Sequence, residues 1–293
     1  MQRALKKHGR YEYAGITRRP DFAWPGGRRL AVYLGFNIEH FDFGAGLGAA
    51  LGPKSPEPDV LNYSWRDYGN RVGVWRCLEL FDQLKLPAAA LINTALYDYC
   101  PEVIEACVKR GDELVGHGHA NSERQGELSE GDERLLLLSC KEKILKESKQ
   151  DISGWLSPWI SETVVTPDLL AETGYRYTLN WCHDDQPVKF ATRSGKTLWS
   201  IPYPQELNDI PMIVARQMDA GDFADMIVDN FDEMLGQSEA QPLVMGIALH
   251  PYLVGQPYRL RHLRRALEHV AAKRKKIWFT TPGAICAQVD GRG

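Results

Sequence analysis

The sequence predicts a single α/β barrel domain over residues 1–293, with parallel strands inside and helices outside. Apolar runs of strand length alternate with segments whose apolar residues recur at helical spacing, the pattern of repeated strand–helix–strand units. Polar clusters directly follow several of the apolar runs. Because the reactive groups of a parallel barrel gather at the carboxyl ends of its strands, these clusters indicate an enzyme.

The expected elements follow one another in a regular order. Residues 30–36 form a continuous apolar run, as expected for a strand buried on both faces. Pro101 and Gly111 delimit a short helix, since proline suits a first turn and glycine the position past the end. Strands are expected over residues 30–36, 88–93, the segment that carries His117, 154–158, 175–181, 198–203, 243–249 and 276–279. Helices are expected over residues 72–84, 101–110, 129–150, 168–173, 222–235 and 258–273.

Two segments stand outside this alternation. Residues 1–28 are polar and contain two prolines and a Gly-Gly pair, which predicts an N-terminal arm wrapped over the body. Residues 44–58 are rich in glycine and proline and predict a long loop, or lid, over the end of the first strand.

Composition narrows the class of protein. The net charge of -3 and pI of about 6.3 provide no basic field for nucleic acid or anionic lipid, so neither is expected as a partner. The six cysteines are dispersed without a C-x-x-C pair, and no run approaches the length of a membrane span. We therefore expect a cytoplasmic protein with reduced thiols.

The segment Leu114-Val-Gly-His-Gly-His-Ala-Asn121 is the first candidate reaction centre. In an extended strand, side chains two residues apart share a face, so His117 and His119 are expected to point into one cavity. Histidine titrates near neutral pH and is the commonest metal ligand. The alternative is that both are ordinary hydrogen-bonding residues of a loop.

Further polar residues fall at the ends of other expected strands, where a barrel would bring them together. Surface carboxylates would instead be scattered over helix faces. The clusters are Asn37/Glu39, His117/His119/Asn121, Trp155/Ser157, Asn180/Trp181 with Asp184/Asp185, Glu206/Asn208/Asp209, and His250.

The order of these clusters resembles the motif series of the polysaccharide deacetylase superfamily over about residues 30–285. The motifs are Phe36-Asn-Ile-Glu39, His117-Gly-His-Ala-Asn121, Gly154-Trp-Leu-Ser-Pro158, Asn180-Trp181 and Leu249-His250-Pro251. The resemblance implies a distorted barrel of seven to eight parallel strands. Four longer segments, residues 68–76, 184–187, 206–211 and 250–257, resemble the branch of allantoinase-like proteins and cyclic imide hydrolases (imidases). The resemblance to this branch implies a homotetramer.

The sequence departs from the deacetylase motifs at two places. Deacetylases of the family carry an aspartate pair at the first strand and two histidines four residues apart. Here Asn37 and Glu39 stand at the first motif, and Asn121 occupies the position four after His117. An amide is a poor zinc ligand, so the deacetylase metal site does not transfer directly.

Two mechanisms are compatible with these residues. In the first, Glu39, His117 and either His119 or Asn121 hold Zn²⁺, which lowers the pKa of a bound water for attack on a carbonyl. In the second, Glu39 is a general base, and His117 and His250 stabilise the oxyanion and protonate the leaving nitrogen.

Several residues are expected to contact a small ring. Arg71, with Asn70, is a candidate for gripping a ring carbonyl, although it could equally form a surface salt bridge. Trp155 and Trp181 are candidate walls, with burial in the core as the alternative. The set is completed by Ser157, Asn180, Asp185 and Glu206. The alternative for the carboxylates Asp184, Asp185, Glu206 and Asp209 is that they order the rim or pair with Arg71.

The leading interpretation is a hydrolase that opens small cyclic imides such as succinimide to half-amides, with hydantoins and dihydropyrimidines as further candidate rings. An imide nitrogen leaves as an anion delocalised over its second carbonyl, so a weaker catalytic set suffices. The alternatives are de-N-acetylation of an amino sugar, an allantoinase, and a barrel that binds a cyclic metabolite without turning it over.

Overall fold

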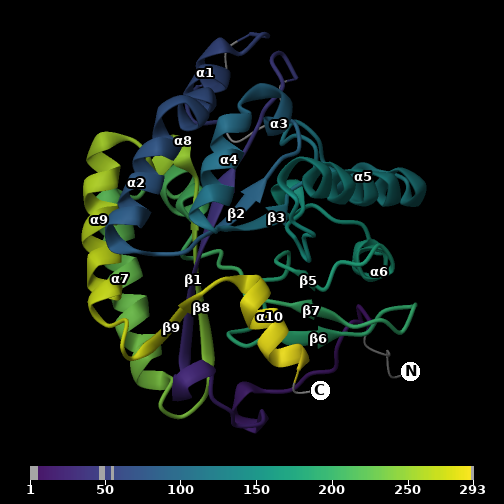
Figure 1. Ribbon diagram of the computed structural model, residues 1–293, viewed down its shortest axis with the longest axis vertical. Helices are drawn as coiled ribbons and strands as arrows, with labels where there is room; N and C mark the ends of the chain where they lie inside the picture. The colour runs from purple at the N-terminus through teal and green to yellow at the C-terminus, as the bar shows by residue number, and fades with distance from the viewer. Residues whose placement is uncertain (1–5, 46–49, 54–55, 292–293) are drawn as a thin grey trace, which may run out of the picture.

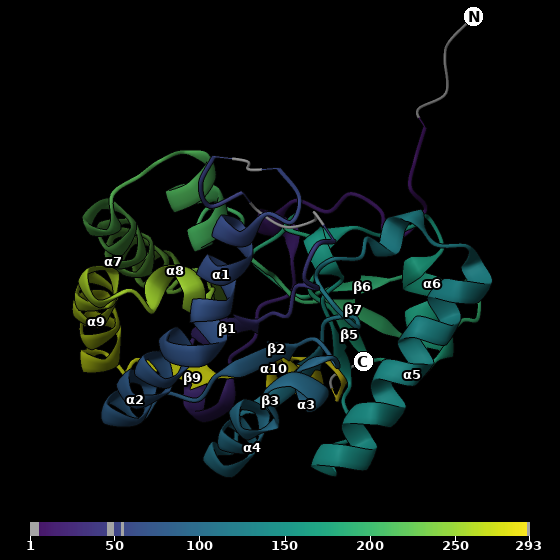
Figure 2. The same cartoon turned by 90° about the horizontal axis from the view of Figure 1, so that it is seen from above.

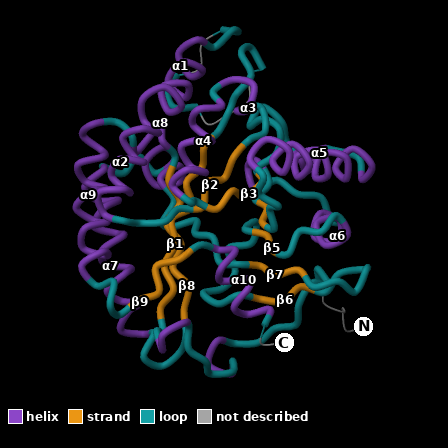
Figure 3. Tube along the Cα trace, in the orientation of Figure 1, coloured by secondary structure: helices purple, strands orange, loops and turns teal. Residues whose placement is uncertain are grey.

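Figure 1 shows the computed structural model, which describes residues 6–45, 50–53 and 56–291. A curled, mostly parallel sheet forms the centre, and helices lie outside it (Figures 1 and 3). The view from above shows these helices around the curled sheet (Figure 2). The predicted α/β class and barrel-like arrangement are confirmed.

The strands are β1 (Leu30–Ile38), β2 (Ala89–Ile92), β3 (Glu113–Gly116), β4 (Gly154–Trp155), β5 (Tyr177–Thr178), β6 (Val188–Phe190), β7 (Leu198–Ser200), β8 (Leu243–Leu249) and β9 (Ile277–Thr280). Their spatial order is β6-β7-β5-β4-β3-β2-β1-β8, and β9 pairs with the first part of β1. Among the paired strands only β6 and β7 are antiparallel.

The helices are α1 (Val60–Tyr68), α2 (Val74–Leu84), α3 (Leu96–Tyr99), α4 (Pro101–Arg110), α5 (Glu130–Ser148), α6 (Thr166–Glu172), α7 (Ala220–Gln237), α8 (Pro251–Val254), α9 (Pro257–Ala272) and α10 (Pro282–Asp290). Two π-helical turns, η3 (Gly69–Gly73) and η6 (Ile210–Ala215), flank the site described below. No helix in the described part of the chain has both the length and the apolar character needed to cross a bilayer.

Strand β1 shows how the sequence produces this layering. All nine of its residues are buried. Leu34 and Phe36 face the outer core beneath the helices, whereas Ala31 and Tyr33 face the inner core of the curled sheet. Burying a large apolar side chain contributes roughly 1.5–3 kcal/mol, so both faces stabilise the strand. The same alternation places Asn37 on the inner side at the end of β1.

Several elements differ from the sequence-based expectation. Strands β4 and β5 are shorter than expected, with two residues each. Strand β6 and helices α1, α3, α8 and α10 were not predicted. Strand β6 and helices α3 and α8 have only three or four residues each, too few for a period to appear. Helices α1 and α10 have nine residues each, which is shorter than the roughly 10–12 residues over which a helical period is distinguished from other patterns.

The arm and the lid are both partly described. Within the arm, Arg10 forms a bidentate ion pair with Asp168, at 2.7 and 2.8 Å, and Trp24 donates to the Leu243 carbonyl. Residues 1–5 of the arm and residues 46–49 and 54–55 of the lid lie outside the described part. In the rest of the lid, the backbone N–H groups of Leu51 and Gly52 donate to Asn62 Oδ1 of α1.

Candidate active site

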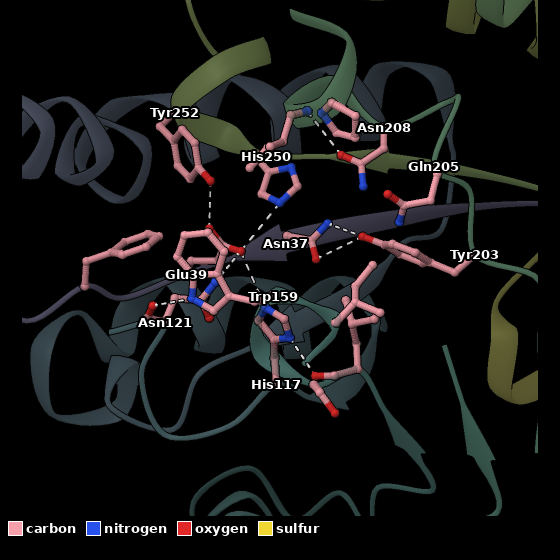
Figure 4. Close-up of a pocket in the computed structure, with 16 residues that line it drawn as sticks. Asn37, Glu39, His117, Asn121, Trp159, Tyr203, Gln205, Asn208, His250 and Tyr252 are labelled. Atoms are coloured by element: carbon pink, nitrogen blue, oxygen red, sulfur yellow. Dashed lines mark hydrogen bonds and ion pairs between the residues drawn. The ribbon is translucent and has the colours of Figure 1, made fainter. Parts of the chain in front are cut away.

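A cavity of about 170 Å³ opens where β1, β3, β4 and β8 end (Figure 4). Glu39 follows β1, His117 follows β3 and His250 follows β8, and all three side chains line this cavity. The parallel pairings of β1 with β2 and β8, and of β2 with β3, bring these strand ends to one edge of the sheet. Three predicted catalytic residues therefore meet in one chamber.

Glu39 is at the centre of the cluster and is only 5% exposed. Its Oε1 lies 3.4 Å from His117 Nε2 and 3.5 Å from His250 Nε2. Asn121 Nδ2 donates to the same oxygen at 2.6 Å, and the Tyr252 hydroxyl donates to Oε2 at 2.8 Å. These donors fix the carboxylate between the two imidazoles, as Figure 4 shows.

The hydrogen bonds of His117 determine which of its nitrogens carries a proton when the ring is neutral. His117 Nδ1 lies 2.7 Å from the Leu156 carbonyl, which can only accept, so Nδ1 is the N–H donor. The buried Nε2 has no hydrogen-bond partner within the described part of the chain. A neutral His117 therefore presents its Nε2 lone pair to the cavity beside Glu39.

His250 is paired with a buried carboxylate on its other side. His250 Nδ1 lies 2.6 Å from Asp209 Oδ1, and the His250 backbone N–H donates to Asp209 Oδ2 at 2.8 Å. Asp209 is fully buried. The carboxylate thus holds the imidazole by two bonds and directs its Nε2 towards Glu39.

The charges of this cluster shift two pKa values in opposite directions. Burial raises the pKa of Glu39, but the imidazoles of His250 and His117 outweigh burial and hold it well below its ordinary value. Burial lowers the pKa of His250, but the carboxylates of Asp209 and Glu39 outweigh burial and raise it to about 10. At neutral pH the cavity therefore contains an ionised Glu39 beside a protonated His250.

Helix α8 holds Tyr252 against Glu39 because its backbone packs directly on η3. A Cβ atom on Gly73 would lie 2.1 Å from the Pro251 carbonyl oxygen, and one on Gly255 would lie 2.3 Å from the Gly73 Cα. Only glycine permits this approach. Gly73 and Gly255 therefore position Tyr252, which lines the cavity.

We expect Gly73→Ala to lower the free energy of unfolding by about 1–3 kcal/mol, because the added methyl group must displace α8. The same displacement weakens the Tyr252–Glu39 hydrogen bond. Urea denaturation measures the first effect. Gly236→Ala in α7 is the matched control, since its Cβ would meet nothing within 4 Å, and we expect it to stabilise the protein slightly. Equal stabilities of the two variants would contradict this description of α8.

The predicted zinc ligands do not assemble. Gly118 has φ of 74°, so the chain turns out of the strand and His119 is exposed, with its Nδ1 3.2 Å from Thr94 Oγ1. Asn121 presents its amide N–H to Glu39 while its Oδ1 accepts from Asn93 at 3.0 Å. The expectation that His117 and His119 share a face is therefore wrong. Across residues 6–45, 50–53 and 56–291, no group of three His, Cys, Asp or Glu side chains has a metal-binding arrangement.

Most of the predicted substrate contacts lie outside the cavity. Arg71 and Asp185 are exposed, and Glu206 forms an exposed ion pair with Arg216. Asp184 does not pair with Arg71, one of its two expected roles, but forms an ion pair with Arg19 of the arm.

The two predicted tryptophan walls also lie elsewhere, whereas Ser157 does line the cavity. Trp155 is fully buried in the outer core. Trp181 packs against His8 and Tyr11 of the arm. Asn180 supports Ser157 from behind, donating to its Oγ at 2.8 Å.

Trp159 supplies the aromatic wall that sequence analysis missed. It lines the cavity and donates from Nε1 to the Asn121 carbonyl at 2.9 Å. Trp159 and Ile160 have φ of 64° and 53°, a left-handed conformation that is strained for side chains of this size. Such strain concentrates at functional sites. Pro158, which precedes the turn, is the only local signal in the sequence.

Tyr203, Gln205 and Tyr252 also line the cavity and were not predicted. Asn37 Nδ2 donates to the Tyr203 hydroxyl at 2.9 Å, so these two side chains form a polar floor. Tyr252 could have been found from its position two residues after His250. Residues 203 and 205 lie in an irregular segment, whose sequence has no strand or helix period to show which side chains face the cavity.

Comparisons with known proteins relate the chain to a superfamily. No family model matches the chain. A Schizosaccharomyces pombe protein named as a polysaccharide deacetylase is 27% identical over 277 residues, covering 87% of this chain and 84% of that protein. A Helicobacter pylori peptidoglycan deacetylase is 23% identical over 266 residues, covering 80% of this chain and 88% of that protein. The chain is related to the polysaccharide deacetylase superfamily.

Two solved structures place the fold in the same superfamily. A Pseudomonas aeruginosa protein named as a polysaccharide deacetylase matches with a TM-score of 0.82 and 25% identity, covering 94% of this chain and 96% of that one. The Puue allantoinase matches with a TM-score of 0.80 and 26% identity, covering 96% and 98%. The predicted barrel of polysaccharide deacetylase type is therefore confirmed.

Proposed function

We propose that this protein hydrolyses small cyclic imides, opening the ring to a half-amide by water attack on a ring carbonyl. The observation that carries the proposal is the ionised Glu39 between His117 Nε2 and the protonated His250 in a cavity of about 170 Å³. The similarity to an allantoinase over nearly the whole chain supports a ring as substrate. The specific ring is part of the proposal.

In the proposed reaction His117 acts as the base and His250 as the acid. A water in contact with Glu39 Oε1 and His117 Nε2 is oriented by both, and His117 takes a proton as the water oxygen bonds to the ring carbonyl carbon. His250, positively charged, stabilises the oxyanion that forms. The C–N bond then breaks, and the nitrogen takes its proton from His250 Nε2.

This division revises the role expected for Glu39. A carboxylate whose pKa is held well below its ordinary value is a weak base. Its negative charge instead orients the water and keeps His250 protonated. No step needs a metal ligand from His119 or Asn121.

The second candidate function is de-N-acetylation of an amino sugar, which the names of the sequence relatives favour. Both reactions hydrolyse an amide C–N bond. Asn37 stands where deacetylases of the family carry an aspartate, which favours the imide reaction. A small cavity walled by Trp159 also suits a free ring better than a sugar chain.

The test is to incubate purified protein with succinimide, glutarimide, hydantoin and allantoin, and to follow ring opening by the loss of ultraviolet absorbance. Acetate release from N-acetylglucosamine oligomers is measured in parallel. Each assay is repeated after treatment with a strong chelator. We expect imide opening that survives the chelator. Acetate release without opening of any ring would overturn the proposal.

The pH dependence of stability follows from the same two groups. The raised pKa of His250 contributes stability that is fully present below its ordinary value of 6.5 and is lost as pH rises towards about 10. The lowered pKa of Glu39 contributes stability that is present above 4.5 and is lost as pH falls below it. We expect thermal denaturation to show both losses.

The raised pKa of His250 should also appear in the pH–rate profile. As pH rises from neutral, we expect kcat/KM for ring opening to stay level and then to fall near pH 10, where His250 loses its proton. A loss of activity that sets in as pH rises past the ordinary histidine value of 6.5 would contradict the role of Asp209 and Glu39 as the groups that keep His250 charged.

A further inference from the structure

We propose that Gln205 and Asn208 select rings that carry a free N–H between two carbonyl groups. This inference rests on the proposed imide hydrolysis and names its substrate class more narrowly. Both carboxamides line the catalytic cavity, and Figure 4 shows them on the side of Asn37 and His250. Neither has a role in the catalytic cluster described above.

The backbone places both residues firmly. The segment that carries them runs beside β8, where the Ala248 N–H donates to the Leu207 carbonyl at 2.8 Å and Asn208 forms a parallel bridge with Ala248. Asp209, the next residue, binds His250 through both of its oxygens. The two carboxamides are therefore held in fixed register with the acid of the proposed reaction.

Asn208 is suited to donate rather than accept. It is 5% exposed, and its Oδ1 already accepts from the Ile210 N–H at 3.1 Å. Its Nδ2 has no acceptor within the described residues, although the side chain lines a cavity. This leaves a donor beside His250 for the ring carbonyl that is not attacked.

Gln205 supplies the complementary acceptor. Its carboxamide has no hydrogen-bond partner in the described part of the chain, so its Oε1 is free to accept the ring N–H. The neighbouring amide of Asn37 is already bonded to the Tyr203 hydroxyl and to the Leu249 carbonyl. An acceptor at Gln205 and a donor at Asn208 together match the –CO–NH–CO– edge of an imide.

A ring with an alkyl group on its nitrogen loses this match. The N–H bond disappears, and the alkyl group meets the Gln205 oxygen, which loses both water and a donor. Sites built to bind a polar hydrogen reject an analogue that lacks it far more strongly than sites that only exclude volume. For the half-buried Gln205 we expect a selectivity of about 100-fold.

The experiment compares kcat/KM for succinimide and N-methylsuccinimide in the wild-type protein, in Gln205→Leu and in Glu206→Gln. Glu206 is the matched control, because it is the next residue but forms an exposed ion pair with Arg216. We expect the succinimide preference to be about 100-fold in wild type and in Glu206→Gln, and about 10-fold or less in Gln205→Leu. The change should lie mainly in KM. A ratio within one variant is independent of how much of that variant is folded.

Two results would overturn the inference: equal rates of the wild-type protein on both rings, or an unchanged preference in Gln205→Leu. If the wild-type protein opens neither ring, the proposed function fails, and ligand-observed NMR then tests the site by binding alone. Selective binding of succinimide that is lost in Gln205→Leu would support the inference without the reaction. Absence of binding, or equal binding of both rings, would end it.

Discussion

Replacing Glu39 by glutamine is expected to lower kcat for imide opening by about 10³-fold, the largest effect of any single substitution. The variant keeps the shape of the side chain but removes the negative charge between His117 and His250. The water then faces a neutral amide oxygen, a weaker acceptor than the carboxylate, and the pKa of His250 falls below about 10. Steady-state kinetics and the pH–rate profile measure both consequences.

Glu113→Gln is the matched control for this substitution. Glu113 is a partly buried carboxylate that accepts from the Tyr177 hydroxyl at 2.7 Å, but it lies at the start of β3 and away from the cavity. We expect its kcat to match that of wild type. Near-normal activity in Glu39→Gln would contradict the role given to Glu39, because it would show that no proton or charge effect passes through this residue.

Replacing Asp209 by asparagine is expected to lower kcat by about 100-fold at pH 8 but much less at pH 5. The variant removes the carboxylate that lies 2.6 Å from His250 Nδ1, so His250 is protonated only at a lower pH. The basic limb of the pH–rate profile should therefore move down from about 10. The shape of the profile distinguishes a lost charge from misfolding.

The control for Asp209→Asn is Asp232→Asn. Asp232 also pairs with a histidine, lying 2.9 Å from His269 Nε2, but on the exposed face between α7 and α9. We expect its pH–rate profile to coincide with that of wild type. A profile of Asp209→Asn that is lower by the same factor at every pH would contradict the assignment of His250 as the acid.

The sequence predicted which three polar residues at strand ends meet in the cavity better than it predicted the other residues that line it, because the strands are regular. Glu39, His117 and His250 directly follow apolar runs, so the parallel sheet alone brings them together. The error at His119 came from extending the strand through Gly118, whose positive φ ends the alternation.

The positions of the remaining residues of the cavity depend on irregular segments, whose sequences show neither a strand nor a helix period. Asp209 was expected at the rim, but the bridge from Asn208 to Ala248 carries it under His250. Tyr252 is placed by the contact of two glycine-rich turns that are far apart in sequence. Trp159 took the role expected of Trp155 because the chain turns through two left-handed residues after Pro158. Such long-range contacts leave no local pattern.

The most direct test of the account is a crystal structure of Glu39→Gln soaked with succinimide. We predict one ring in the cavity, with a carbonyl carbon facing His117 Nε2 and His250 Nε2 and with the ring N–H directed at Gln205. A ring bound outside this cavity, or one whose carbonyls face away from both imidazoles, would contradict it.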